Sequence, residues 1–170
     1  MASFGESSVV VLIGPMGVGK TTVGKKLARA LKLPFIDTDA LIVADHGEIS
    51  KIFETEGEPV FRHYEEDAMA HAISAPAVVA TGGGAVLSQL TRDRLKDQAT
   101  VIYLSTDGRH IRARLTGGKR PLLKNGFEDW TRIYDERKPV YEQAADITVN
   151  TSGHTLSATV NEIKQKLGVE

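Results

Sequence analysis

The sequence contains no cysteine, almost no net charge and no long hydrophobic run, and each absence excludes a class of protein. Without cysteine there is no disulfide, thiolate metal site or cysteine nucleophile, which fits a reducing compartment. Lysine and arginine number 21 against 22 aspartate and glutamate residues, whereas non-specific nucleic-acid binding needs a basic excess. The longest apolar run near the N-terminus, residues 9–13, is far shorter than the ~20 residues of a membrane helix, and no secretory signal is visible before it. We therefore expect a cytoplasmic protein that binds neither nucleic acid nor membrane.

A chain of 170 residues, 41% of them hydrophobic, is long enough for one well-buried domain, which we expect to span residues 1–170. Short apolar runs suited to strands buried on both faces alternate with helical patterns. This alternation predicts an α/β fold with helices on both faces of a parallel sheet and functional loops at the carboxyl ends of the strands. The expected strands are residues 9–14, 34–37, 77–81, 100–105 and 146–150. The expected helices lie within residues 24–33, 49–74, 108–115 and 154–167, the second reading as two helices broken near Gly57 and Pro59.

One glycine-flanked segment, TGGKRPLLKNG at residues 116–126, lacks a clear period and carries cations between its glycines. Such a segment suits a mobile lid over an anionic ligand, and we place this lid at about residues 115–126. Arg120 within it is a candidate to swing over a phosphoryl group. The alternative is an ordinary exposed cation of a loop.

The strongest local signal is GPMGVGKT at residues 14–21, which matches G-x-x-x-x-G-K-[ST] between a predicted strand and a predicted helix. Its glycines let backbone N–H groups converge on phosphate oxygens at a helix N-terminus. Lys20 would reach the terminal phosphates, and the hydroxyl of Thr21 would help to hold Mg2+. The alternative is a glycine-rich turn with an incidental lysine. The motif predicts a nucleoside triphosphate site, and its expected ATP-binding residues are Gly17, Val18, Gly19, Lys20, Thr21 and Thr22.

Two carboxylates follow the second predicted strand in FIDTD, residues 35–39. Side chains two residues apart on a strand point to the same face, so Asp37 and Asp39 can turn into the cleft beside the phosphate motif. Asp37 would support the metal, directly or through water, and Asp39 would align an attacking hydroxyl or accept its proton. The alternative is a turn at the strand end in which Asp39 caps the next helix.

Two further stretches carry an arginine in acidic surroundings, EPVFRHYEED with Arg62 and DERKPVYEQAAD with Arg137. Taken singly, each arginine is typical of a solvated helix residue. The stretch TGGGAVL, residues 81–87, follows a predicted strand without the lysine of a phosphate loop. Its glycines serve either a tight turn or the close approach of a ligand to the backbone, and three in a row exceed what a turn needs.

Together these motifs resemble shikimate kinase. The resemblance rests on GPMGVGKT, FIDTD, FRHYEED, TGGGAVL, KRPLL and ERKPVYEQAAD, in this order and spacing, and it covers the chain from residue 9 to about residue 150. It implies a P-loop NTPase-type three-layer sandwich with a five-stranded parallel sheet and a mobile lid. It also implies ATP- and Mg2+-dependent phosphorylation of the 3-hydroxyl of shikimate, giving shikimate 3-phosphate and ADP in the chorismate pathway to aromatic amino acids.

The resemblance implies a role for each matching residue. The expected catalytic residues are Asp39, Lys20 and Arg120, where Asp39 serves the hydroxyl and the two cations neutralise the phosphates. Thr21 and Asp37 are the expected magnesium ligands. The expected shikimate-binding residues are Asp39, Arg62, Glu65, Gly82, Gly83, Gly84 and Arg137. Because guanidinium groups pair bidentately with carboxylates, Arg62 and Arg137 would hold the acid group of the substrate from both sides. The family is often monomeric, so we expect a monomer.

One part of the chain departs from the family pattern. Members commonly hold adenine between a lid-flanking arginine, here Arg114 with Arg109 and Arg112 of the same short basic helix as alternatives, and a segment after the fifth strand that contains Arg and Pro. This chain reads TSGHTL there, so base contacts would come from Ser152, Gly153 or His154.

Two other functions share the phosphate motif. A gluconate kinase would also have the lid, but it has less reason to pair two arginines around a run of glycines. A nucleotide-dependent switch usually ends a strand with a metal-binding aspartate, where AVVATGGG ends in threonine and glycines.

Overall fold

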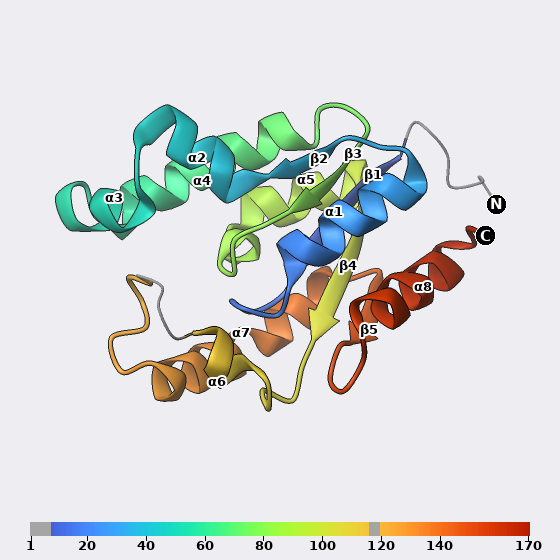
Figure 1. Ribbon diagram of the computed structural model, residues 1–170. Helices are drawn as coiled ribbons and strands as arrows, with labels where there is room; N and C mark the ends of the chain where they lie inside the picture. Colours follow the sequence, from blue (N-terminus) through green and yellow to red (C-terminus); the bar gives the residue numbers. More distant parts are fainter. Residues whose placement is uncertain (1–7, 116–119) are drawn as a thin grey trace.

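A five-stranded parallel sheet forms the centre of the protein, of which the computed structural model describes residues 8–115 and 120–170 (Figure 1). The strands lie in the order β2-β3-β1-β4-β5, and every neighbouring pair is parallel. They are β1 (Val9–Ile13), β2 (Phe35–Asp37), β3 (Ala77–Ala80), β4 (Thr100–Ser105) and β5 (Ile147–Asn150). The predicted strands and the parallel sheet are therefore confirmed.

Helices connect the strands and cover the sheet. They are α1 (Lys20–Leu31), α2 (Thr38–His46), α3 (Ile49–Thr55), α4 (Glu58–Ala72), the 3-10 turn η1 (Ala85–Leu87), α5 (Gln89–Gln98), α6 (Ile111–Arg114), α7 (Phe127–Ala144) and α8 (Leu156–Leu167). The predicted break within residues 49–74 falls at Glu56 and Gly57. Pro59 lies inside the first turn of α4, where a missing N–H leaves no hydrogen bond unmade.

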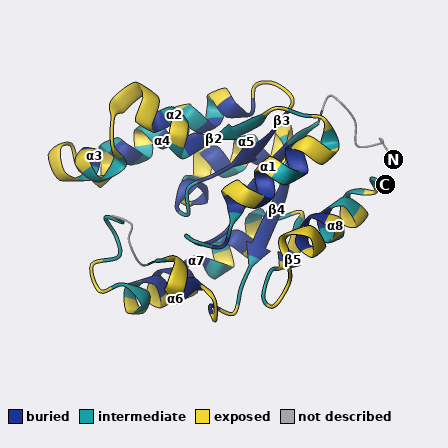
Figure 2. Cartoon of the chain, in the orientation of Figure 1, coloured by how far each residue is buried: buried dark blue, intermediate teal, exposed yellow. Residues whose placement is uncertain are grey.

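The three central strands, β3, β1 and β4, are buried on both faces, and their successive side chains point to opposite sides. On one face, Val11 and Ile13 of β1 join a core that includes side chains of α4, α5 and α7. On the other face, Val10 and Leu12 pack with α1 and α8. The dark blue of buried residues accordingly runs through the strands and the inner sides of these helices (Figure 2). This arrangement is the three-layer sandwich that the sequence predicts.

A smaller apolar cluster holds α2, α3 and α4 together beside β2. It is formed by Ile42, Ile52 and Phe61, one from each helix. This cluster fixes the start of α4, which carries Arg62 and Glu65. Within residues 8–115 and 120–170, no helix combines the length and the apolar character needed to cross a membrane.

Candidate active site

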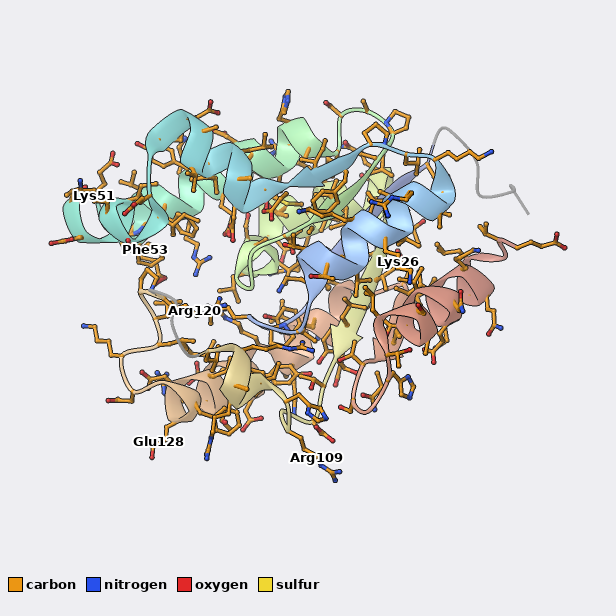
Figure 3. All side chains as sticks on the ribbon, viewed as in Figure 1. Lys26, Lys51, Phe53, Arg109, Arg120 and Glu128 are labelled. Carbon is orange, nitrogen blue, oxygen red and sulfur yellow. The ribbon has the colours of Figure 1, made fainter. Side chains whose placement is uncertain are left out.

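A cleft of about 760 Å³ opens at the carboxyl ends of the strands. Residues that follow all five strands line it, as expected for the ligand crevice of an open parallel sheet. The lining residues are 16–23 after β1, Asp37 and Asp39 at β2, 81–83 after β3, Thr106, 110, 111 and 114 after β4, and 151–156 after β5, together with Arg120 and Thr159. Arg120 reaches toward this space from the segment before α7 (Figure 3).

The phosphate loop, residues 14–21, joins β1 to α1. Gly14, Gly17 and Gly19 all have positive φ angles, of 146°, 79° and 105°, so a side chain at any of them would strain the backbone. Gly14 also lies so close to β4 that a Cβ would be 2.6 Å from the carbonyl oxygen of Leu104. Gly19 is the N-cap of α1, and the first N–H groups of a helix have no partner within it. The loop can therefore offer N–H groups to an anion at a helix N-terminus.

Lys20 lies buried inside this loop. Its Nζ donates to the carbonyl oxygens of Gly14 at 2.6 Å and Pro15 at 2.9 Å. Burial lowers the pKa of Lys20 to about 8, and the carboxylate of Asp39 opposes this shift. The ammonium group is thus held by weak neutral acceptors at the place where phosphate oxygens are expected, and charged oxygens would bind it more strongly.

Thr21 and Asp37 are joined at the edge of the loop, where the Thr21 hydroxyl donates to Asp37 Oδ2 at 3.0 Å. The other oxygen of Asp37 caps α2 by accepting from the N–H of Asp39 at 2.9 Å and of Ala40 at 3.3 Å. The alternative in which Asp39 caps this helix is therefore wrong, because Asp37 occupies that role.

This pair fits Mg2+ by its chemistry, since hydroxyl and carboxylate oxygens are the hard ligands that the ion prefers. Nowhere in the described ranges do three or more His, Asp or Glu side chains gather into a metal site. A site of one hydroxyl and one carboxylate is typical of magnesium that is held mainly by substrate phosphates and water.

Asp39 points into the cleft without a partner for one of its oxygens. Its Oδ1 is buried and forms no hydrogen bond with any described residue. Burial raises the pKa of the Asp39 carboxyl, the charge of Asp37 raises it further, and Lys20 opposes both. The side chain is thus a carboxylate with a free oxygen and increased basicity.

Arg62 and Glu65 form an ion pair on α4, in which Nη1 of Arg62 donates to Oε1 of Glu65 at 2.9 Å. Glu65 is only 3% exposed. Burial raises the pKa of the Glu65 carboxyl, and the Arg62 guanidinium counteracts this. Arg137 on α7 is buried as well. Neither arginine is a solvated helix residue, so that interpretation of the sequence is wrong for both.

The glycine segment, residues 82–84, brings these charged groups together. None of its three residues has a φ in the left-handed region, so the backbone conformation itself does not require glycine. A Cβ on each residue would face a charged side chain that turns toward the segment, and crowding is strong at Gly82 and Gly84. The charged atoms are Asp39 Oδ1 at 2.9 Å for Gly82, Arg137 Nη1 at 3.4 Å for Gly83, and for Gly84 the Arg62 guanidinium, whose Nη1 is nearest and whose Cζ lies at 2.6 Å.

Arg120 adds a fourth cation to Lys20, Arg62 and Arg137. Its Nε is buried and has no hydrogen-bond partner among the described residues, and its charge lowers the pKa of both Lys20 and Asp39. The predicted lid at residues 115–126 includes residues 116–119, which lie outside the described residues. The part that follows them, residues 120–126, forms turns that lead into α7.

At the other end of the cleft, Arg114 lies on the phosphate loop and donates from Nη1 to the Gly17 carbonyl at 2.9 Å. Opposite it runs the segment after β5. The Ser152 hydroxyl accepts from the N–H of Asp107 at 2.7 Å, so this group already has a partner within the fold. Gly153 and His154 line the cleft, and so do Thr155 and Leu156, which the sequence did not single out.

Two aromatic residues of α7 that sequence reasoning missed also contact the site. Trp130 donates from Nε1 to the carbonyl oxygen of Met16 at 2.7 Å. The Tyr141 hydroxyl donates to the carbonyl oxygen of Gly83 at 2.5 Å. The available signal was spacing, because residues 130, 134, 137 and 141 follow one face of a helix.

Comparison with known proteins gives a consistent result. The family model described as shikimate kinase matches residues 16–168. A shikimate kinase of Rhodococcus jostii is 41% identical over 162 residues, which cover 92% of this chain and 96% of that protein. A shikimate kinase of Vibrio parahaemolyticus is 39% identical over 167 residues, covering 95% and 97%. The solved structure of a shikimate kinase from Acinetobacter baumannii in complex with shikimate has a TM-score of 0.91 at 36% identity, over 96% of this chain and 94% of that one.

Proposed function

The chain belongs to the shikimate kinase family, and we infer that it transfers the γ-phosphate of ATP to the 3-hydroxyl of shikimate. The products are shikimate 3-phosphate and ADP, in the pathway to chorismate and the aromatic amino acids. One observation carries the assignment of residues: Asp39, Arg62 and Arg137 all turn toward the glycine segment beside the phosphate loop.

The two arginines bind the carboxylate of shikimate in this proposal. They contact neighbouring glycines, Gly83 and Gly84, so one carboxylate can meet both guanidinium groups. Glu65 fixes the position of Arg62 through their ion pair. The N–H groups of the glycine segment then donate to oxygens of the substrate, which lies close to the backbone because no Cβ intervenes.

Asp39 is the proposed base. Its free oxygen accepts the hydrogen of the 3-hydroxyl and orients that oxygen toward the γ-phosphorus. As the new oxygen–phosphorus bond forms, the bond from the γ-phosphorus to the oxygen retained by ADP breaks, and the proton passes to Asp39. The raised pKa of this carboxyl favours the proton transfer.

Lys20 and Arg120 neutralise the charge of the phosphates during transfer, and both lie close enough to interact electrostatically with each other and with Asp39. Thr21 and Asp37 would hold Mg2+. When bound, the ion would neutralise further charge on the phosphate oxygens. Positioning and charge neutralisation are most of what phosphoryl transfer requires of a protein.

ATP is held by the N–H groups of residues 17–22, with adenine beside Arg114. That the protein is a monomer stays a prediction from the resemblance. A location in the cytoplasm stays a prediction from the sequence.

A coupled assay of ADP release tests the function, with shikimate, quinate and gluconate offered as acceptors. We expect ADP release only with shikimate. Release with gluconate alone would support a gluconate kinase, and release without any acceptor would support a nucleotide-dependent switch. Asp39→Asn is the matched control, because it keeps the shape of the site, removes the base and shows whether a contaminating kinase contributes.

A further inference from the structure

One face of α7 connects three separate loops of the active site. Along this face, Trp130 donates to the carbonyl of Met16 in the phosphate loop, and the Tyr134 hydroxyl accepts from the N–H of Thr106 after β4 at 3.3 Å. Tyr141, at the far end of the row, donates to the carbonyl of Gly83. Arg137 lies between the two tyrosines in sequence and belongs to the proposed acceptor site.

Within the described fold, the carbonyl groups of the glycine segment are hydrogen-bonded and its N–H groups are not. All three carbonyl oxygens accept hydrogen bonds from the fold: that of Gly82 from the N–H of Ala85 at 3.2 Å, that of Gly83 from Tyr141 and that of Gly84 from the N–H of Leu87 at 3.1 Å. In contrast, the N–H groups of residues 82–84 donate to no other residue in the described part of the chain. The segment is therefore a surface of free donors, suited to a ligand that presents oxygens.

Tyr141 differs from the other two donors because it acts through a side chain. The carbonyls of Gly82 and Gly84 are bound by backbone N–H groups three residues on, as part of the local turn at η1. The carbonyl of Gly83 is reached from another element, 58 positions away in sequence. A substitution at Tyr141 can therefore remove this interaction and leave the turn intact, and it also removes the hydrogen bond between the Tyr141 hydroxyl and Arg137.

The planarity of the peptide bond links the Gly83 carbonyl to the N–H of Gly84. No peptide in the described residues is cis, and the C=O and N–H of a trans peptide point in opposite directions. Tyr141 is 1% exposed and lies on the buried side of the segment, whereas Gly82 and Gly83 line the cleft and the buried Gly84 follows directly on them. With its carbonyl held toward Tyr141, this peptide turns the N–H of Gly84 away from the core.

We propose that Tyr141 is a positioning residue for shikimate, whose hydroxyl holds the Gly83–Gly84 peptide so that the N–H of Gly84 donates to the bound acid. This inference rests on the proposed function of the same site. Gly84 is also the residue packed against Arg62, so the substrate carboxylate held by that arginine is the group that this N–H would meet.

The surroundings of Tyr141 suit a fixed donor. Its ring stacks on that of Tyr103 at 5.2 Å, which limits its movement. Burial raises the pKa of Tyr141 to about 12, so the hydroxyl keeps its proton throughout the range in which such an enzyme is assayed. Without this hydroxyl, the Gly83 carbonyl would lack a partner and the peptide would be free to rotate, which residues without Cβ atoms permit readily.

The kinetic test compares Tyr141→Phe with wild type and with Tyr103→Phe. The control variant also removes one hydroxyl from the same aromatic cluster, one that is hydrogen-bonded to Tyr134 at 2.5 Å and makes no contact with the glycine segment. We expect Tyr141→Phe to raise KM for shikimate about five- to tenfold, with KM for ATP changed less than about twofold. Tyr103→Phe should leave both KM values near those of wild type, even if it lowers Tm as much as Tyr141→Phe does. A shikimate KM that is unchanged in Tyr141→Phe, or raised equally in both variants, would overturn the inference.

A measurement on the wild-type protein covers the case in which Tyr141→Phe does not fold. Addition of shikimate should shift the amide resonance of Gly84 in an ¹⁵N–¹H spectrum, as expected when a free N–H gains an acceptor. An unshifted Gly84 amide at saturating shikimate would reject the role of this peptide. Phosphorylation of shikimate by the wild-type enzyme separates the two proposals: its absence would refute the function, whereas its presence with a silent Gly84 amide would refute only the role of Tyr141.

Discussion

Gly84 lies directly against the guanidinium of Arg62, and a Cβ at this position would be 2.6 Å from Arg62 Cζ. We therefore expect Gly84→Ala to push the Arg62 side chain out of the acceptor site. The backbone of Gly84, with φ −103° and ψ 5°, is open to alanine, and the displaced atoms are the far end of a flexible side chain. Because the displaced Arg62 also leaves its ion pair with Glu65, stability should fall by no more than the loss of about 1–3 kcal/mol expected for breaking that pair, while KM for shikimate rises at least tenfold. Steady-state kinetics and thermal unfolding of the purified variant measure the two effects.

Gly83→Ala is the matched control for this change. A Cβ on Gly83 would lie 3.3 Å from Met16 Cγ and 3.4 Å from Arg137 Nη1, which small shifts can relieve. Its effect on shikimate KM should be clearly smaller than that of Gly84→Ala. Equal effects would mean that crowding of Arg62 is not what makes glycine necessary at position 84.

Arg137→Ala should weaken shikimate binding with little effect on ATP. A hydrogen bond to a charged group contributes about 1.5–3 kcal/mol, which corresponds to a tenfold or greater rise in KM for shikimate. KM for ATP should stay within about threefold of wild type, since Arg137 does not line the nucleotide end of the cleft. Kinetics with each substrate varied in turn measure both constants. An unchanged KM for shikimate would remove Arg137 from the acceptor site.

Much of the fold could be predicted because its strands are short apolar runs between polar segments. The helices were less regular. α5 and α7 lay outside the expected helices. Among the ten residues of α5 only Thr91 and Leu95 are buried, so its sequence has no strong helical period, and α7 contains Pro139 in its interior. α1 begins at Lys20, four residues before the expected start, because the phosphate motif itself supplies the first turn of the helix. The motif predicted a turn and a helix as separate features, and the structure joins them.

The residues of the site could be found wherever a motif constrains several positions at once. The roles of neighbouring residues within a motif were harder to predict from the sequence. Asp37, not Asp39, caps α2, because capping depends on backbone angles that the residue types alone do not determine. Tyr141 could not be predicted, because its hydroxyl binds a backbone carbonyl and every residue has such a carbonyl whatever its side chain. Ser152 is one of three residues expected to contact the base, and its hydroxyl also accepts from the N–H of Asp107 across two loops that are distant in sequence, a contact that the sequence did not reveal.

Arg62→Ala should make the stability of the protein more dependent on pH. Burial raises the folded-state pKa of Glu65 above its unfolded value, and the charge of Asp39 raises it as well. Arg62 and Arg137 both lower this pKa, so loss of Arg62 raises it further while Arg137 still lowers it. A carboxyl with a raised pKa contributes stability that is complete below its unfolded pKa and is lost as the pH rises through the folded one. The free energy of unfolding of Arg62→Ala should therefore fall by about 1–3 kcal/mol relative to wild type as the pH rises above the ordinary glutamate pKa of 4.5 toward neutral pH.

Urea unfolding at several pH values measures this loss, and the double variant Arg62→Ala/Glu65→Gln provides its control. Glutamine keeps the shape of Glu65 without a titrating group, so the added pH dependence should disappear in the double variant. If the single and double variants showed parallel pH profiles, the dependence would come from another group, with Asp39 the first candidate.

Arg120→Ala should lower kcat severely while the fold stays intact. The buried Nε of Arg120 has no partner among the described residues, so its removal leaves no group in that part of the chain without a hydrogen bond. Tm should accordingly change little. Arginines that act on the transferring phosphoryl group contribute roughly 10³–10⁵-fold in rate, and we expect a loss in this range together with a smaller rise in KM for ATP. Lys124→Ala, which removes an exposed cation four residues along the same segment, is the matched control and should retain wild-type turnover. The charge of Arg120 lowers the pKa values of Lys20 and Asp39. If Arg120→Ala kept a normal kcat, this charge would affect only the protonation of those two groups and would take no part in phosphoryl transfer.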